Sequence, residues 1–173
     1  LKSLKTPLRY PGGKSRAVTR MSQFFPDLNE YYQFREPFLG GGSVALWVTK
    51  QYPNLIIWVN DLYEPLYNFW SQLQENGEDI QSKLLELKAE HNDQDKAKEL
   101  FILAKEEIGN KSLSNRDRAV YFYIINKCSF SGLSEASSFS KQASDSNFSV
   151  RGIERLCEYQ SIIKNWKITN YSY

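Results

Sequence analysis

Histidine, cysteine and methionine are scarce in this chain of 173 residues, which has one histidine (His91), two cysteines (Cys128 and Cys157) and one methionine. A single histidine disfavours a mechanism that needs a histidine base, and also a metal site rich in histidine. Two cysteines far apart in the sequence indicate reduced thiols rather than a disulfide framework or a zinc site. These scarcities favour a cytoplasmic protein that holds no metal.

Long apolar stretches and a strong excess of charge are missing as well. No apolar run approaches the roughly 18 residues of a membrane span, and the sequence does not begin with a segment of the signal-peptide type, so we expect no membrane association. The net charge is only +2, but six basic residues precede the first acid, Asp27. A basic segment of this kind attracts phosphate, although a solvated helix face is its commoner cause. The six are Lys2, Lys5, Arg9, Lys14, Arg16 and Arg20.

What the chain does have is a strand–helix–strand pattern near its start. A helix pattern over 14–25 comes before a strand over 32–38, which leads into a run of glycines. A helix over 43–52 follows, with Ser43 placed to cap it, and then a continuous apolar stretch over 55–59 typical of a buried parallel strand. Together these elements predict a βαβ unit, the opening of a doubly wound α/β sheet.

Helix patterns then interrupt the α/β alternation. They cover 65–74, 78–108 and 151–165, and Ser114 followed by Asp117 resembles a capping box that opens a further helix through 125. The serine-rich residues 129–149 indicate a hairpin or a long loop, and 167–171 indicate a returning strand. A subdomain inserted into a sheet explains this order better than one continuous wind.

We therefore predict three parts. Residues 1–64 form the beginning of the sheet domain, 65–165 form a mainly helical insertion with the hairpin at 129–149, and 166–173 return to the sheet. With so few strands, the predicted sheet is incomplete.

The glycine run Gly40-Gly41-Gly42 and the later Asp61 are the first candidate site. Glycines after a strand let backbone N–H groups approach a ligand closely, with a helix N-terminus behind them. An acid at the end of the next strand, about 20 residues on, binds the ribose hydroxyls of an adenosine-containing cofactor. The alternative interpretation involves no ligand. The glycines would then only permit a tight turn, and the Asn60-Asp61 pair would only cap the helix near Pro65.

The type of cofactor is narrowed by two departures from phosphate-binding motifs. The turn lacks the third glycine of G-x-G-x-x-G, because Ala45 stands there. Gly13-Lys14-Ser15 resembles the end of a P-loop, but that motif needs a glycine where this chain has Leu8. S-adenosylmethionine carries no phosphate and fits both departures, while an enzyme acting on a nucleotide phosphate remains the alternative.

Four segments carry a resemblance to a known family. They are residues 8–14, 36–44, Asn60-Asp61 and 118–133, and their order is similar to that of Dam-like (D12 class) DNA adenine-N6 methyltransferases. The resemblance implies a Rossmann-like methyltransferase sheet with an inserted, mainly helical target-recognition subdomain. It also implies S-adenosylmethionine as cofactor and double-stranded DNA as partner, and it allows a cognate restriction endonuclease as a second partner.

The resemblance assigns roles to individual residues. The residues it implies for cofactor binding are Tyr10, Lys14, Phe38, Gly40, Gly42 and Asp61, with Tyr10 stacking near the cofactor and Lys14 meeting its carboxylate. The residues it implies for DNA binding are Arg9, Asn126, Lys127, Phe130 and Leu133. Arg9 would point toward a guanine or a phosphate, and Phe130 would wedge into the duplex beside a flipped adenine.

Two departures from the family pattern bear on function. The hairpin has Glu135 where the family often has an arginine that reads guanine, so GATC recognition does not follow from the resemblance. The family's catalytic Asp-Pro-Pro-Tyr does not occur, and Asn170-Tyr171-Ser172-Tyr173 lacks its prolines. We thus expect an inactive piece of a methyltransferase, and the alternative is a non-catalytic DNA-binding module with a degenerate methyltransferase fold.

Overall fold

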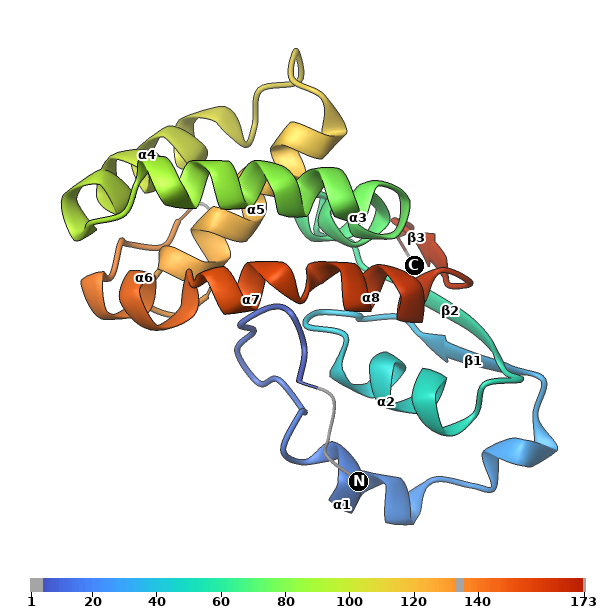
Figure 1. Cartoon of the computed structure of the whole chain (residues 1–173). Coiled ribbons are helices and arrows are strands. Elements are labelled where there is room, and N and C mark those ends of the chain that lie inside the picture. The colour runs from blue at the N-terminus through green and yellow to red at the C-terminus, as the bar shows by residue number, and fades with distance from the viewer. Residues whose placement is uncertain (1–4, 133–135, 173) are drawn as a thin grey trace.

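The computed structural model describes residues 5–132 and 136–172. A small parallel sheet lies at one end of an array of helices (Figure 1). Its strands are β1 (Gln33–Glu36), β2 (Ile56–Asn60) and β3 (Lys167–Thr169), in the order β1-β2-β3 and all parallel. The α/β class with a parallel sheet is therefore confirmed, and the long crossover between β2 and β3 contains most of the helices.

The helix between the first two strands is α2 (Ser43–Gln51). Its N-cap is Gly42 in the left-handed conformation, and no side chain caps it, so the prediction that Ser43 is the cap was wrong. Ser43 is instead the first helical residue, and its hydroxyl lies 2.9 Å from that of Ser15. The tight turn requires a positive φ at the residue before the helix, which only glycine adopts at low cost.

The segment before β1 is less helical than its sequence pattern predicts. One turn of helix, α1 (Val18–Met21), continues into the short 3-10 helices η1 (Ser22–Phe24) and η2 (Leu28–Glu30). The predicted helix over 14–25 therefore begins later, because residues 14–17 form turns that lead into it. Asp27 caps η2 by accepting a hydrogen bond from the amide of Asn29.

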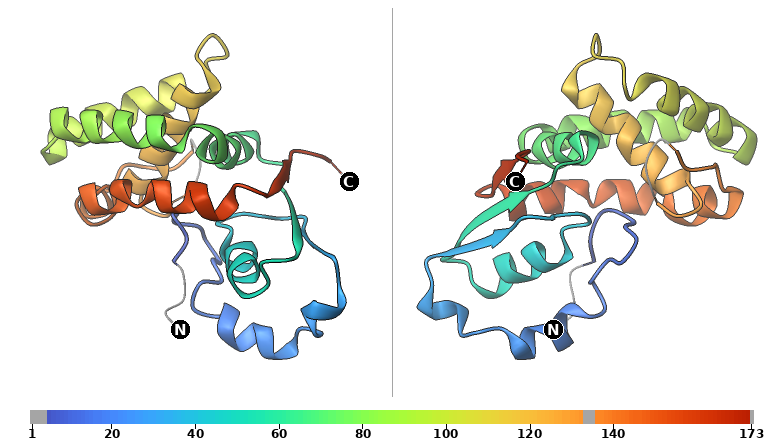
Figure 2. Two further views of the ribbon diagram at one scale, coloured as in Figure 1. Left: turned by 45° about the vertical axis from the view of Figure 1, so that its right-hand side comes forward. Right: turned by 180° about the vertical axis from the view of Figure 1, so that it is seen from behind.

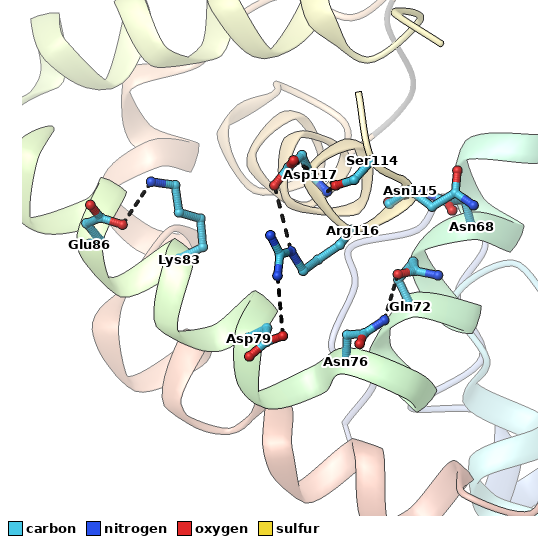
Figure 3. Close-up of polar contacts among 10 residues, drawn as sticks. All are labelled: Asn68, Gln72, Asn76, Asp79, Lys83, Glu86, Ser114, Asn115, Arg116 and Asp117. Carbon is cyan, nitrogen blue, oxygen red and sulfur yellow. Dashed lines mark hydrogen bonds and ion pairs between the residues drawn. The ribbon is translucent and has the colours of Figure 1, made fainter. Parts of the chain in front are cut away.

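The longest helix is α3 (Glu64–Glu90), and α4 (Gln94–Glu107) follows after a short bend. The boundary predicted between 74 and 78 corresponds to a kink inside α3, where Asn76 has non-helical φ and ψ. The single helix predicted over 78–108 was wrong, because residues 91–93 separate α3 from α4. The Asn76 side chain donates to Gln72 on the preceding turn, at 2.9 Å (Figure 3). The adjacent Gly77 lies so close to α8 that a Cβ there would be 2.6 Å from the Gln160 side chain, so this glycine permits close packing rather than ending a helix.

Serines begin three of the later helices. Ser114 caps α5 (Asn115–Cys128) as predicted, by accepting from the amide of Asp117. Ser140 and Ser149 cap α6 (Lys141–Asn147) and α7 (Val150–Glu154). The predicted hairpin or loop over 129–149 is thus too long: an antiparallel bridge joins Ser129 to Phe139, and helices follow. The predicted helix over 151–165 is divided into α7 and α8 (Leu156–Ile163) at Arg155.

The core is centred on α3, which packs against α5 and α8. Phe69, Trp70 and Tyr123 are fully buried there. The helix α8 runs between α2 on one side and α3 on the other (Figure 2). The Gln74 amide donates to the carbonyls of Ile163 and Trp166, at 2.7 and 2.9 Å, and thereby fixes the approach to β3.

Candidate functional site

The glycine turn after β1 has the geometry of a ligand-binding loop. Gly40 and Gly42 have φ values of 51° and 70°, which non-glycine residues rarely adopt. The ring of Tyr10 lies directly against this turn, because a Cβ at Gly40 would be 3.0 Å from Tyr10 Cε1. A Cβ at Gly41 would likewise be 3.0 Å from the Cβ of Tyr10. The absent side chains therefore let an aromatic ring and the turn approach each other.

The Asp61 carboxylate faces the glycine turn. Its Oδ2 accepts a hydrogen bond from the Gly40 amide at 2.9 Å, and its Oδ1 accepts one from the Tyr63 amide at 3.1 Å. The N-cap of α3 is Tyr63, with no side-chain cap bond, so Asp61 does not cap that helix. The structure thus joins the two sequence features, the glycines and the acid one strand later, through a direct contact.

A cavity of about 290 Å³ lies between the N-terminal loop and the glycine turn. That volume is at the lower end of those of small-molecule sites. Five of the six residues predicted to bind the cofactor line it, namely Tyr10, Lys14, Phe38, Gly40 and Gly42. The sixth, Asp61, adjoins the cavity through its bond to the Gly40 amide. Lys14 Nζ donates to the carbonyl of Gly12 at 3.0 Å, so its charge lies at the loop.

Glu36 is a lining residue that the sequence interpretation left out. It ends β1, and its Oε2 accepts from the amide of Ala45 in the first turn of α2, at 2.9 Å. Burial raises the pKa of Glu36 to about 7, and the nearby Asp61 carboxylate adds to the rise while the Ala45 amide and Lys14 oppose it. The sequence feature that could have identified Glu36 as a site residue was an acid at the carboxyl end of the strand that precedes the glycines.

The raised pKa of Glu36 predicts a pH-dependent stability. Because the folded chain keeps the Glu36 proton up to about pH 7 and the unfolded chain loses it near pH 4.5, stability falls as the pH rises between those values. Glu36→Gln keeps the acceptor for the Ala45 amide and removes this loss. We expect the variant to be more stable than wild type at pH 8 by about 2 kcal/mol. Urea unfolding at pH 5 and pH 8 measures it.

The exposed Glu99 on α4 provides the control, since Glu99→Gln should leave the difference between the two pH values unchanged. A Glu36→Gln variant with the same pH dependence as wild type would contradict the assignment.

Arg9 and Asn126 join the N-terminal loop to the end of α5. The Asn126 side chain accepts from the Arg9 amide at 2.9 Å and donates to the carbonyls of Arg9, at 2.7 Å, and of Gly132, at 2.8 Å. The Arg9 guanidinium donates to the carbonyls of Ser129, at 2.6 Å, and Phe130, at 3.1 Å. We call these five residues the Arg9 clasp.

The DNA contacts predicted for these residues stay predictions. Asn126 is only 1% exposed, so in this structure its polar atoms serve the clasp. Phe130, in contrast, is 78% exposed beside the base of the hairpin, as a residue that wedges into a duplex must be. Leu133 lies outside the described residues.

Lys127 follows Asn126 of the clasp and is partly buried. Its Nζ is 5.2 Å from the centroid of the Tyr123 ring. Burial lowers the pKa of Lys127 to about 8, and the positive charge of Arg9 lowers it further, while Cys128 opposes the shift. The folded protein therefore holds a charged lysine at neutral pH at a cost in stability.

Replacing this charge should stabilise the protein. Because the folded pKa of Lys127 is lower than the unfolded one, the cost is complete below about pH 8 and disappears as the pH rises toward 10.5. We expect Lys127→Met to raise the free energy of unfolding at pH 7 by about 2 kcal/mol, measured by urea unfolding. The exposed Lys111, changed to Met, should have no such effect. Equal effects of the two changes would refute a specific cost at Lys127.

Comparison with known proteins decides the family. A model of the D12 class of N6 adenine-specific DNA methyltransferases matches residues 10–173. The chain belongs to this family. It is also 25% identical over 138 residues to the Type II methyltransferase M.MjaIII of Methanocaldococcus jannaschii. The aligned residues cover 75% of this chain and 47% of that protein. The chain therefore spans about half the length of this methyltransferase.

Asn170 and Tyr171, which directly follow β3, form local hydrogen bonds in the structure. The side-chain amide of Asn170 donates to the backbone carbonyls of Asp61, at 2.7 Å, and Leu62, at 3.0 Å. The Tyr171 amide donates to Asn60 Oδ1 at 2.8 Å. These bonds join β3 to the loop that contains Asp61. In this methyltransferase family member, Asn170 thus helps to position the acid beside the glycine turn.

A second cavity, of about 310 Å³, opens beside the carboxyl ends of the three strands. Glu36 lines both this cavity and the one at the glycine turn. Within residues 5–132 and 136–172, no group of three or more His, Cys, Asp and Glu side chains has the arrangement of a metal site. The helices of that same part of the chain include none with the length and hydropathy required to cross a bilayer.

Proposed function

We propose that this chain carries the S-adenosylmethionine site and part of the DNA-contact surface of an enzyme that methylates adenine N6 in double-stranded DNA. The observation that carries the proposal is the Asp61 carboxylate, 2.9 Å from the Gly40 amide beside a cavity of suitable size. Membership of the N6 adenine-specific family supports the choice of cofactor and of the base that is methylated. A DNA substrate also agrees with the cytoplasmic location expected from the sequence.

The residues around the cavity fit an adenosine-containing methyl donor. In this proposal Asp61 accepts hydrogen bonds from the ribose hydroxyls, and the backbone of Gly40 to Gly42 comes close to the nucleoside. Tyr10 covers one side, and Lys14 at the loop pairs with the carboxylate of the amino-acid end. When bound, S-adenosylmethionine supplies an electrophilic methyl group.

The DNA side of the proposal rests on the hairpin that follows α5. Its exposed Phe130 is suited to fill the space that a flipped base leaves in the stack. Residues 65–165, with this hairpin, are proposed as the target-recognition part, and the sheet segments before and after them as the cofactor part. Asn126 and Lys127 then act from the base of the hairpin rather than on the DNA bases.

The step on adenine itself is assigned to other residues. The sequence contains neither Asp-Pro-Pro-Tyr nor Asn-Pro-Pro-Tyr. We propose that groups outside these 173 residues accept hydrogen bonds from the adenine amino group and take up the one proton that it loses on methylation, so that the 173-residue chain alone transfers no methyl.

Methylation of duplex DNA with radiolabelled S-adenosylmethionine tests the proposal. The complete protein should produce N6-methyladenine, identified by separation of the nucleosides, and the 173-residue chain should bind the cofactor without incorporation. Incorporation by this chain would overturn the assignment of catalysis to outside residues. If the complete protein binds DNA and methylates nothing, the alternative of a non-catalytic DNA-binding module is correct.

A further inference from the structure

The N-terminal segment around Arg9 contacts two separate parts of the molecule. On one side, the Thr6 hydroxyl donates to the carbonyl of Gly41, and the Tyr10 ring lies against Gly40. On the other side, Arg9, which lies between these residues, is bound to Asn126 at the end of α5 and to the base of the hairpin. Residues 6–10 thus connect the turn at the cofactor cavity with the hairpin that carries Phe130.

The contact between Arg9 and the hairpin is tight. Gly132 has a φ of 71°, and a Cβ at this position would be 2.6 Å from Arg9 Cβ and 2.8 Å from the Arg9 carbonyl oxygen. The Gly132 amide donates to Ser129 Oγ at 3.0 Å, and the Gly132 carbonyl accepts from Asn126. A displacement of Arg9 therefore cannot occur without a change in the hairpin.

We propose that the Arg9 clasp couples cofactor binding to the conformation of the DNA-contacting hairpin, and that Asn126 is the positioning residue of this coupling. The inference rests on the proposed function. A cofactor that fills the cavity contacts Tyr10 and restrains the loop, and the five hydrogen bonds of the clasp transmit this restraint to Ser129, Phe130 and Gly132. The coupling is reciprocal, so DNA bound at the hairpin strengthens cofactor binding by the same factor.

Hydrogen exchange of backbone amides, with and without S-adenosylmethionine, tests the coupling. The reporters at the hairpin are the amides of Phe130 and Ser140, which donate across its base to Ser138 and Cys128. The reporters at the cavity are the amides of Gly40 and Gly42. In wild type, saturating S-adenosylmethionine should slow exchange at both places, by about tenfold at the hairpin.

In Asn126→Ala, the cofactor should still slow exchange at Gly40 and Gly42, and the slowing at the hairpin should disappear. Arg9→Ala offers a milder change, because it removes the guanidinium bonds to the hairpin and leaves the bonds between the Arg9 backbone and the Asn126 side chain. This variant should weaken the slowing. The matched control is Asn68→Ala, which removes another buried asparagine that donates to α5, at the Asn115 carbonyl 2.8 Å away (Figure 3). This control should keep the full slowing.

The outcomes separate the two proposals. If S-adenosylmethionine protects neither the glycine turn nor the hairpin, the cofactor assignment fails. If it protects the turn in wild type and leaves the hairpin unchanged, the coupling is refuted and the cofactor assignment stands. A loss of hairpin slowing in Asn68→Ala as large as in Asn126→Ala also overturns the role of the clasp, since general stability would then explain it.

Discussion

Gly42→Ala should destabilise the protein by about 3 kcal/mol and lower the melting temperature by about 10 °C. Gly42 has a φ of 70°, where a residue with a Cβ is strained. Its Cβ would also be 2.8 Å from Cζ2 of Trp70, a fully buried ring whose Nε1 donates to the Gly40 carbonyl at 3.1 Å. The ring cannot move away without disturbing the glycine turn itself, so the two costs add.

Gly12→Ala separates these two costs. Gly12 also has a φ of 70°, but no atom lies within 4 Å of the position that its Cβ would occupy. We expect a loss of only about 1 kcal/mol for this variant, because conformational strain is then the whole effect. Thermal unfolding of both variants measures the difference. Equal losses would show that Trp70 does not press against the turn as the structure has it.

Asp61→Asn should lower the affinity for S-adenosylmethionine by at least about tenfold and destabilise the unliganded protein by about 1 to 3 kcal/mol. Both carboxylate oxygens accept from backbone amides, those of Gly40 and Tyr63. Asparagine has one acceptor oxygen, so its NH₂ group must face one of these N–H donors. The change therefore disturbs the turn proposed to contact the cofactor and removes the acceptor proposed for the ribose.

Asp93→Asn is the matched control for this change. Asp93 accepts from the Lys96 amide as the N-cap of α4, a position where asparagine is as good as aspartate. Calorimetric titration and thermal unfolding should both give wild-type values for this variant. If Asp61→Asn binds the cofactor as tightly as Asp93→Asn does, Asp61 has no part in the site.

The local patterns of the sequence predict much of the sheet and of the cavity at the glycine turn. The strand at 55–59, the glycines and Asp61 lie within one βαβ unit, where short-range rules fix the turn and the position of the acid. The cavity consequently contains most of the predicted cofactor residues. Glu36 was missed because its raised pKa arises from burial and from the nearby Asp61 carboxylate, which only the folded chain brings about.

The later helices and the clasp were harder to predict for two physical reasons. Serine both caps helices and forms loops, so Ser140 and Ser149 gave no clear sign that α6 and α7 begin after them. Arg9 and Asn126 are 117 residues apart, and no periodic pattern relates positions so distant. An asparagine near the end of an apolar helix looks like a surface residue until the loop that it binds is in place.

Titration calorimetry of the chain with S-adenosylmethionine and with ATP tests the central claim most directly. The geometry of Asp61, the glycine turn and the adjoining cavity predicts binding of S-adenosylmethionine at least about tenfold tighter than that of ATP, and a loss of this preference in Asp61→Asn. Equal or tighter binding of ATP, or no binding of S-adenosylmethionine by the folded chain, would contradict it.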